Sequence, residues 1–258
     1  MIFVREPLVL AQFTGLDPDL RFEIAAASRA LPSLYPLPTD ILREAPKTHF
    51  LRLQHPLSEY FMALNVVPSQ PDRSHSECEA LKWVNERFGP LENSSRSAFK
   101  SQLASLNKRL MNGASEWRRD DICLNGDRDG NSVRFPAAAA IPEQLDSIRS
   151  ILVQDYEEPT IFRATMALAL LVNCHPFVDG NGRVGRSLFN YALRQGGMPT
   201  NVYFPFYEIA RQSRGGYEIA LRCAEVRGDW QPLLRFVLDM IECYREIAGQ
   251  RSTAEADT

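Results

Sequence analysis

The sequence His175-Pro-Phe-Val-Asp-Gly-Asn-Gly-Arg-Val-Gly-Arg186 decides the fold of this 258-residue chain. An apolar run over 160–174 precedes it, and a second helical pattern over 187–195 follows it. The pattern predicts a helix, a loop and a second helix that begins in the loop. Two glycines in the loop permit backbone conformations that other residues rarely adopt, and the N–H groups at the helix start favour an anion. The stretch therefore predicts a phosphate-binding loop between two helices.

Five side chains of this loop carry chemistry that suits a nucleotide. His175 titrates near neutral pH and can accept a proton from an attacking hydroxyl. Asp179 offers a hard oxygen ligand of the kind that Mg²⁺ uses beside phosphates. Arg183 and Arg186 lie three positions apart on the second helix, so both guanidinium groups can reach the same side and bind phosphate in a two-pronged way. Asn181 can donate its side-chain amide to a phosphoryl oxygen.

The motif resembles the signature of the Fic family, whose members transfer nucleotides to protein hydroxyl groups. Its matching positions are His175, Pro176, Phe177, Gly180, Asn181, Gly182, Arg183 and Arg186. The resemblance extends over 115–247. It implies that His175 is the general base and Asp179 the magnesium ligand. It also implies that the nucleotide-binding residues are Phe177, Gly180, Asn181, Gly182, Arg183 and Arg186. The Phe177 ring is expected to be buried under the loop as an anchor.

The resemblance implies a protein adenylyltransferase that moves AMP from ATP, with Mg²⁺, to a Ser, Thr or Tyr hydroxyl of a target protein. Gly180 and Gly182 argue against the family branch that moves a γ-phosphate and has an alanine and a lysine there. UMP or another nucleotide stays open, because the loop recognises phosphates and not the base. A non-catalytic module that binds a nucleotide or a phosphopeptide is the alternative of another class, and removal of AMP from a target is a third.

Many members of the family are restrained by a glutamate that follows a Ser or Thr by four positions. This glutamate pairs with the second arginine of the motif, which here is Arg186. No Ser or Thr of this chain is followed four positions later by Glu. The sequence therefore predicts either a separate antitoxin-like protein that supplies the glutamate to Arg186, or an enzyme without restraint.

A run of turn-forming residues over 126–131 separates two short apolar segments. Ile122 and Leu124 precede the run, and Val133 and Phe135 follow it, so the pattern predicts two strands joined by a turn. In the Fic family a flap of this kind lies beside the active loop and binds the target by main-chain pairing. The alternative is an ordinary surface hairpin. The predicted fold is mainly α, a Fic-type helical bundle with a short β-hairpin flap beside the active-site loop.

Helical periodicity and helix-ending residues predict the remaining elements. The expected helices span 17–30, 76–88, 93–111, 142–156, 161–172, 216–226 and 230–247. Recurrent prolines distinguish the first part of the chain. The predicted divisions are an N-terminal, proline-punctuated helical region over 1–111, a Fic core over 112–248 and a polar, disordered tail over 249–258.

Composition is that of an ordinary globular protein, with 45% hydrophobic and 24% charged residues. The formal net charge of −3 predicts no general affinity for nucleic acid or membranes. Five scattered cysteines indicate free thiols in a reducing compartment, and Cys174 is expected to be a small core residue. No apolar run is long enough to cross a bilayer. The expected location is the cytoplasm, with secretion as an effector left open.

Overall fold

The structure, a computed structural model, describes residues 2–38, 40–58, 73–88, 95–113, 116–123, 132–153 and 157–256. Its helices are α1 (Pro18–Arg29), α2 (Ile41–Glu44), α4 (Arg73–Phe88), α5 (Arg96–Leu110), α6 (Ile141–Val153), α7 (Thr160–Cys174), α8 (Asn181–Gln195), α9 (Phe206–Gln212), α10 (Gly216–Arg227) and α11 (Gln231–Ala256). Short 3-10 helices span Phe13–Gly15, Leu31–Ser33, Lys47–Leu53 and Ala138–Ala140, and the strands in these ranges are β1 (Ile2–Val4) and β2 (Ser132–Arg134). The predicted mainly α fold is confirmed.

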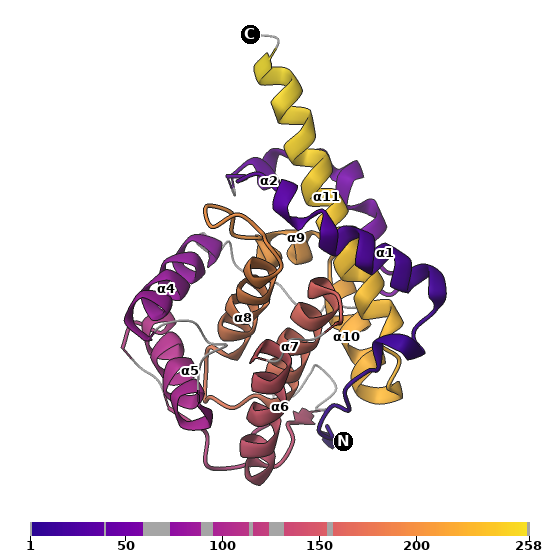
Figure 1. The fold of residues 1–258 in the computed structure, drawn as a ribbon. Coiled ribbons are helices and arrows are strands. Elements are labelled where there is room, and N and C mark those ends of the chain that lie inside the picture. The colour runs from indigo at the N-terminus through magenta and orange to yellow at the C-terminus, as the bar shows by residue number, and fades with distance from the viewer. Residues whose placement is uncertain are drawn as a thin grey trace.

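Helix α7 lies at the centre of the bundle (Figure 1) and packs against α8, α6, α1 and α11. Nearly all of its side chains are buried, which explains why its sequence is apolar almost all round. Gly185 of α8 faces it closely, since a Cβ there would lie 2.9 Å from Leu168 Cδ1. The glycine therefore lets the two central helices approach, and this approach places the loop between them.

The other helices cover opposite sides of this central pair. Helices α4 and α5 pack on α8 on one side, and α10 and α11 lie on the other (Figure 1). Helix α1 begins as predicted, because the Asp17 carboxylate accepts from the backbone N–H of Asp19 at 3.0 Å. Its Leu20 and Ile24 are buried in the same hydrophobic core as the helices after residue 112. The two predicted regions, 1–111 and 112–248, therefore share one core.

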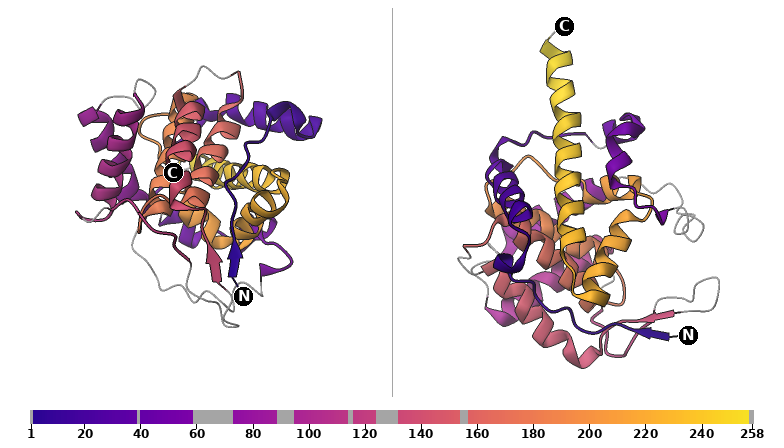
Figure 2. Two further views of the ribbon diagram at one scale, coloured as in Figure 1. Left: turned by 90° about the horizontal axis from the view of Figure 1, so that it is seen from below. Right: turned by 90° about the vertical axis from the view of Figure 1, so that its right-hand side faces the viewer.

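The described residues include the base of the predicted flap, where its two strands pair. Cys123 and Arg134 form an antiparallel bridge, and the Phe135 N–H donates to the Ile122 carbonyl at 3.0 Å. The predicted turn over 126–131 lies outside the described residues. Strand β1 was not predicted: it pairs parallel with β2, as the two neighbouring arrows of Figure 2 show. Local periodicity cannot reveal a pairing between segments separated by more than a hundred residues.

The final helix is longer than the sequence analysis predicted. Helix α11 continues to Ala256 and projects beyond the other helices (Figure 1), so the prediction of a disordered tail over 249–258 is wrong up to Ala256. The segment lacks proline and consists largely of Gln, Arg, Ala and Glu, which favour helix, and a single glycine costs only about 1 kcal/mol there. In the ranges that the structure describes, no helix is long and apolar enough to cross a membrane.

Candidate active site

The loop between α7 and α8 begins and ends with left-handed backbone. His175 caps α7 with φ 48° and ψ 57°, and Gly180 precedes α8 with φ 88°. The conformation is uncommon for a residue with a Cβ, and such strain concentrates at functional sites. The turn reverses the chain within five residues, so the histidine lies close to the start of α8.

The imidazole of His175 lies between the end of α7 and the flap. Its ring stacks on Phe135 with 3.8 Å between centroids, and its Nδ1 lies 3.4 Å from the Val172 carbonyl oxygen. A proton on Nδ1 satisfies that contact and leaves Nε2 as an acceptor. Burial lowers the pKa of His175 to about 4, and the charges of Arg5 and Arg118 act in the same direction. The ring is therefore neutral at pH 7 and able to accept a proton.

Arg118 joins the flap to this loop, and the sequence analysis missed it. Its guanidinium donates to the carbonyl oxygens of His175 at 2.7 Å, Cys174 at 3.0 Å and Asp120 at 3.2 Å. Its backbone N–H donates to the Pro176 carbonyl at 3.0 Å. Because these acceptors are all main-chain groups, no partner residue type in the sequence could mark Arg118 in advance.

Two residues beside His175 behave as the sequence predicts. Phe177 is 0% exposed and packs on Trp117 with 4.4 Å between ring centroids, so it anchors the loop from below. Cys174 is also 0% exposed, and burial raises the pKa of its thiol to about 12. A thiol that stays protonated at pH 7 is a poor nucleophile, which agrees with a core role.

Asn181 supports the loop from inside, and its predicted phosphate contact stays a prediction, since the side-chain amide has a second N–H donor. Its side chain is buried, its Oδ1 accepts from the Phe177 N–H at 2.9 Å, and its Nδ2 donates to the Phe177 carbonyl at 2.8 Å. Turning the chain so tightly buries main-chain groups that need partners. The asparagine side chain supplies an acceptor for the Phe177 N–H and a donor for the Phe177 carbonyl, so it shapes the loop from inside.

The glycines of the motif are explained by contacts within the chain. A Cβ on Gly180 would lie 2.4 Å from Asn107 Nδ2, which itself donates to the Asp179 carbonyl at 2.9 Å. A Cβ on Gly182 would lie 3.3 Å from Arg186 Nη1. Gly180 thus lets α5 pack directly on the loop, and Gly182 leaves room for the arginine.

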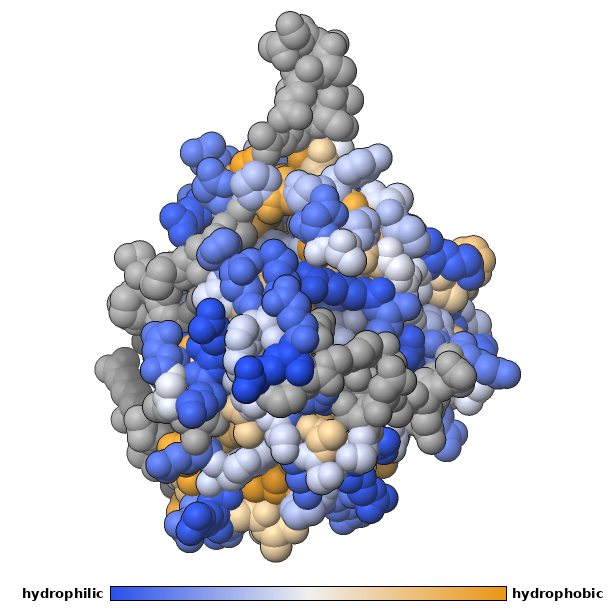
Figure 3. All heavy atoms as spheres, turned by 60° about the vertical axis from the view of Figure 1, so that its left-hand side comes forward, coloured by the Kyte–Doolittle hydropathy of each residue, from blue (hydrophilic) through white to orange (hydrophobic). Residues whose placement is uncertain are grey.

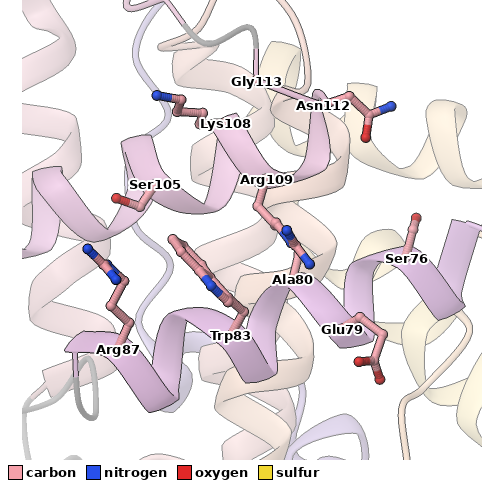
Figure 4. A pocket seen from close by; sticks show the side chains of 10 residues that line it. All are labelled: Ser76, Glu79, Ala80, Trp83, Arg87, Ser105, Lys108, Arg109, Asn112 and Gly113. Carbon is pink, nitrogen blue, oxygen red and sulfur yellow. The ribbon is translucent and has the colours of Figure 1, made fainter.

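The two arginines of α8 point to the same side, as their spacing predicts. Arg183 Nη1 donates to the Leu110 carbonyl at the end of α5, at 2.8 Å. Arg186 meets Glu77 near the start of α4. Figure 4 shows that the start of α4 lies beside the end of α5, so both guanidinium groups approach the same end of this helix pair.

Arg186 is bound by a glutamate of its own chain. Its Nε lies 3.0 and 3.2 Å from the two carboxylate oxygens of Glu77, and its Nη2 also donates to Oε1. The Glu77 side chain is 1% exposed and also accepts from the Tyr203 hydroxyl at 3.3 Å. Burial raises the pKa of Glu77, and the charge of Arg186 opposes that rise. The guanidinium lies 5.1 Å from the centre of the Tyr207 ring.

This ion pair corrects the sequence analysis. The search for a glutamate four positions after Ser or Thr found none, because Arg73 occupies the place four before Glu77. A signal was nevertheless present: Glu77 falls on the same helical face as the buried Ala80 and Leu81. A carboxylate on an apolar face needs a buried cation, and the second motif arginine supplies it.

A cleft of about 830 Å³ lies between α4 and α5, outside the loop. Figure 4 shows Trp83 in its middle, with Arg87, Lys108 and Arg109 around it and Glu79 nearer the start of α4. The side of the molecule that carries these helices is mainly hydrophilic (Figure 3). None of the predicted site residues lines this cleft, so the predicted site and the cleft are separate features.

Asp179 is the metal ligand that the sequence predicts. The described residues contain no group of three or more His, Cys, Asp or Glu side chains that could hold a metal ion. Asp179 is exposed, and its Oδ1 accepts from the Gly180 N–H at 2.5 Å. One exposed carboxylate does fit Mg²⁺, which commonly uses one or two carboxylates together with waters and substrate phosphates.

Comparison with known proteins gives a family for the central part of the chain. Residues 97–193 match the family described as Fic/DOC, so the match begins in α5 and before the predicted core at 112. A protein named protein adenylyltransferase Fic from Drosophila virilis is 40% identical over 79 residues. The relative of that name from Drosophila melanogaster is also 40% identical over 79 residues. These matches cover 31% of this chain and 15% of each relative.

Solved structures share the fold at lower identity. A Fic family protein from Desulfovibrio desulfuricans G20 superposes with a TM-score of 0.59 and 20% identity, covering 96% of this chain and 77% of that chain. Fic-1 from C. elegans gives a TM-score of 0.54 with 19% identity, covering 92% of this chain and 74% of that chain. The fold thus extends beyond the region where the sequences match.

Proposed function

The chain contains a Fic/DOC-family domain over residues 97–193, and we propose that the protein transfers AMP from ATP to a Ser, Thr or Tyr hydroxyl of a target protein. The observation that carries the proposal is a neutral imidazole beside the start of a helix, α8, whose first two turns carry Arg183 and Arg186. In this proposal His175 Nε2 accepts the hydroxyl proton. The hydroxyl oxygen then forms a bond to the α-phosphorus of ATP, and pyrophosphate leaves.

The phosphates are proposed to lie at the start of α8. The first backbone N–H groups of a helix have no partner within the helix and attract an anion. Arg183 supplies a cation beside them, and Arg186 does so once Glu77 has moved. Asn181 and Phe177 contribute by supporting the loop, since their polar and apolar contacts lie within it. Most of the rate acceleration would come from positioning and electrostatics.

Asp179 is the proposed ligand of Mg²⁺. The ion, when bound, would neutralise charge on the phosphates. The carboxylate is exposed and lies directly before the N-terminus of α8, where the phosphates are proposed to bind. Asn107 fixes the Asp179 carbonyl to α5, so the backbone that carries the carboxylate is held in place by a neighbouring helix.

Glu77 is proposed to restrain this activity. It occupies the guanidinium of Arg186, so a triphosphate that needs Arg186 must first displace the carboxylate. An antitoxin-like protein that supplies a glutamate to Arg186 becomes a weaker proposal, because this chain supplies one itself. Glu77 also favours a second candidate activity, removal of AMP from a modified target, which the family resemblance associates with an inhibitory glutamate.

Labelled ATP tests the proposal directly. The protein is incubated with a cell lysate and ATP labelled at the α-phosphate, in parallel with ATP labelled at the γ-phosphate. Label from the α-phosphate on a protein band supports nucleotidyl transfer. Label only from the γ-phosphate contradicts it, and binding of ATP without any labelled band supports the non-catalytic module. Loss of a preformed α-label on longer incubation would identify the removal reaction.

A further inference from the structure

Strand β1 covers the exposed edge of the flap. Its register on β2 pairs Ile2 with Ser132 and Val4 with Arg134, and the Arg5 N–H donates to the Arg134 carbonyl at 2.9 Å. The other side of β2 is already paired near its end with Cys123. Strand β1 is therefore an added edge strand, and its place is one that another extended chain could occupy by the same main-chain pairing.

Two side chains of β1, those of Ile2 and Val4, contribute little to its attachment. Ile2 is 55% exposed and Val4 is 58% exposed, although both are hydrophobic. A strand of three residues whose first and last side chains are exposed belongs to the less stable part of a fold. Backbone pairing alone selects no sequence, whereas the residue that follows the strand, Arg5, can do so.

That residue, Arg5, enters a pocket made for a cation. Its side chain is 7% exposed, its Nη1 donates to Glu225 Oε1 at 3.2 Å, and its Cζ lies 4.6 Å from the centre of the Phe135 ring. The Glu225 side chain is 2% exposed and also accepts from Asn173 Nδ2 at 3.3 Å and from Arg222. A buried carboxylate beside an aromatic face binds a guanidinium through charge and cation–π attraction together.

The pocket adjoins the proposed catalytic base. Phe135 contacts Arg5 and also stacks on the His175 ring at 3.8 Å between centroids. A chain segment that pairs with β2 and places a basic residue on Glu225 is therefore linked to the imidazole through a single ring, that of Phe135. An acceptor hydroxyl close to that basic residue would be delivered to the imidazole, whereas β1 itself, Ile2–Val4, contains no hydroxyl residue.

Main-chain pairing of a target with the flap is what the family resemblance already implies. We propose in addition that the Glu225–Phe135 pocket selects a target segment with an arginine or lysine beside its acceptor hydroxyl, and that β1 with Arg5 occupies the edge of β2 and this pocket until a target displaces it. This inference rests on the proposed transfer activity for its biological meaning. The occupied edge and the cation pocket are properties of the chain alone, so their test does not require transfer.

The test is peptide binding in trans. A fluorescent synthetic peptide with the sequence of residues 1–8 is titrated into the full-length Arg5→Gln variant and into the wild-type chain, and anisotropy is recorded. We expect at least tenfold tighter binding to Arg5→Gln, because its cation pocket is empty. A peptide with glutamine at its own fifth position should lose this advantage. Equal binding to both chains, or binding that ignores the peptide's arginine, overturns the proposal.

Three controls make the result decisive. Arg5→Lys keeps a cation and should exclude the peptide as the wild type does. Arg227→Gln removes the same charge from the exposed end of α10 and should leave peptide binding at the wild-type level. Glu225→Gln should weaken binding in the Arg5→Gln background. If Arg5→Gln does not fold, hydrogen exchange of the wild type decides: the Arg5 amide should exchange at least a hundredfold faster than that of Leu234 in α11, and equal protection overturns the proposal.

Discussion

The loop between α7 and α8 is enclosed from two sides by contacts of different kinds. On the α4–α5 side, a buried ion pair between Glu77 and Arg186 occupies the place proposed for phosphates. On the flap side, β1 pairs by its backbone and Arg5 lies over Phe135, next to His175. The first contact depends on charge alone. The second depends on an extended backbone that carries a positively charged side chain. If the proposed function is correct, the nucleotide and the target would each compete with a different part of the same chain.

The largest expected effect concerns His175, the proposed base, which lies on the flap side. His175→Ala should lower transfer about 10²- to 10⁴-fold, the range that a general base contributes. ATP affinity should change little, because the imidazole makes no proposed phosphate contact. Transfer is measured with α-labelled ATP, and ATP affinity by calorimetry. Retained transfer would show that His175 is not the base.

The next effect tests the α4–α5 side. Glu77→Gln should raise transfer about 5- to 150-fold, the range of typical coupling free energies, because Arg186 becomes available to the triphosphate. The amide keeps a partner for Tyr203, so the fold is expected to survive. Glu79→Gln is the matched control, since Glu79 lies on the same helix but is exposed. ATP should also raise the melting temperature of Glu77→Gln more than that of the wild type, and an equal rise would show that Glu77 does not restrain nucleotide binding.

The two sides also differ in how far the sequence predicts them. The residues of the loop lie next to one another, so spacing predicts the common direction of Arg183 and Arg186. Glu77 and Arg186 are separated by more than a hundred positions, and only the packing of α4 on α8 brings them together. The roles of Arg118 and Arg5 are harder still to predict, because the main-chain carbonyl groups and the aromatic ring that they contact leave no pattern in the sequence. Local chemistry is therefore predictable here, and the contacts that enclose it are not.

A smaller effect tests the support of the flap side. Arg118→Lys keeps the charge but cannot reach all the carbonyl groups that the guanidinium binds, including those of His175 and Cys174. The expected loss is about 1–3 kcal/mol in the free energy of unfolding, since buried acceptors lose their donors. Denaturant unfolding measures this loss. Transfer should fall through kcat while KM for ATP is kept, because Arg118 orients the base and not the phosphates. A rise in KM for ATP by the same factor as the fall in kcat would contradict this division of roles.

The smallest expected effect is a near absence of pH dependence. Burial lowers the pKa of His175 to about 4, so the imidazole should stay neutral, and therefore competent as a base, at pH 5. The ratio kcat/KM for ATP, which reports the chain without bound ATP, should at pH 5 be about 90% of its value at pH 7.5, whereas a base with the ordinary pKa near 6.5 would lose about thirtyfold. Glu77→Gln is the form to use, because the raised pKa of Glu77 would otherwise add a second titration as the pH falls.

A second variant connects this profile with the flap. Adding Arg5→Gln removes a cation that lowers the pKa of His175 and opens the ring to water, so the fall in rate should move to a higher pH. This shift is expected because Arg5 is one of the charges that lower the pKa of His175. A profile that stays in place would mean that His175 is shielded by Phe135 and Arg118 alone. Strand β1 would then cover the flap edge without affecting the base.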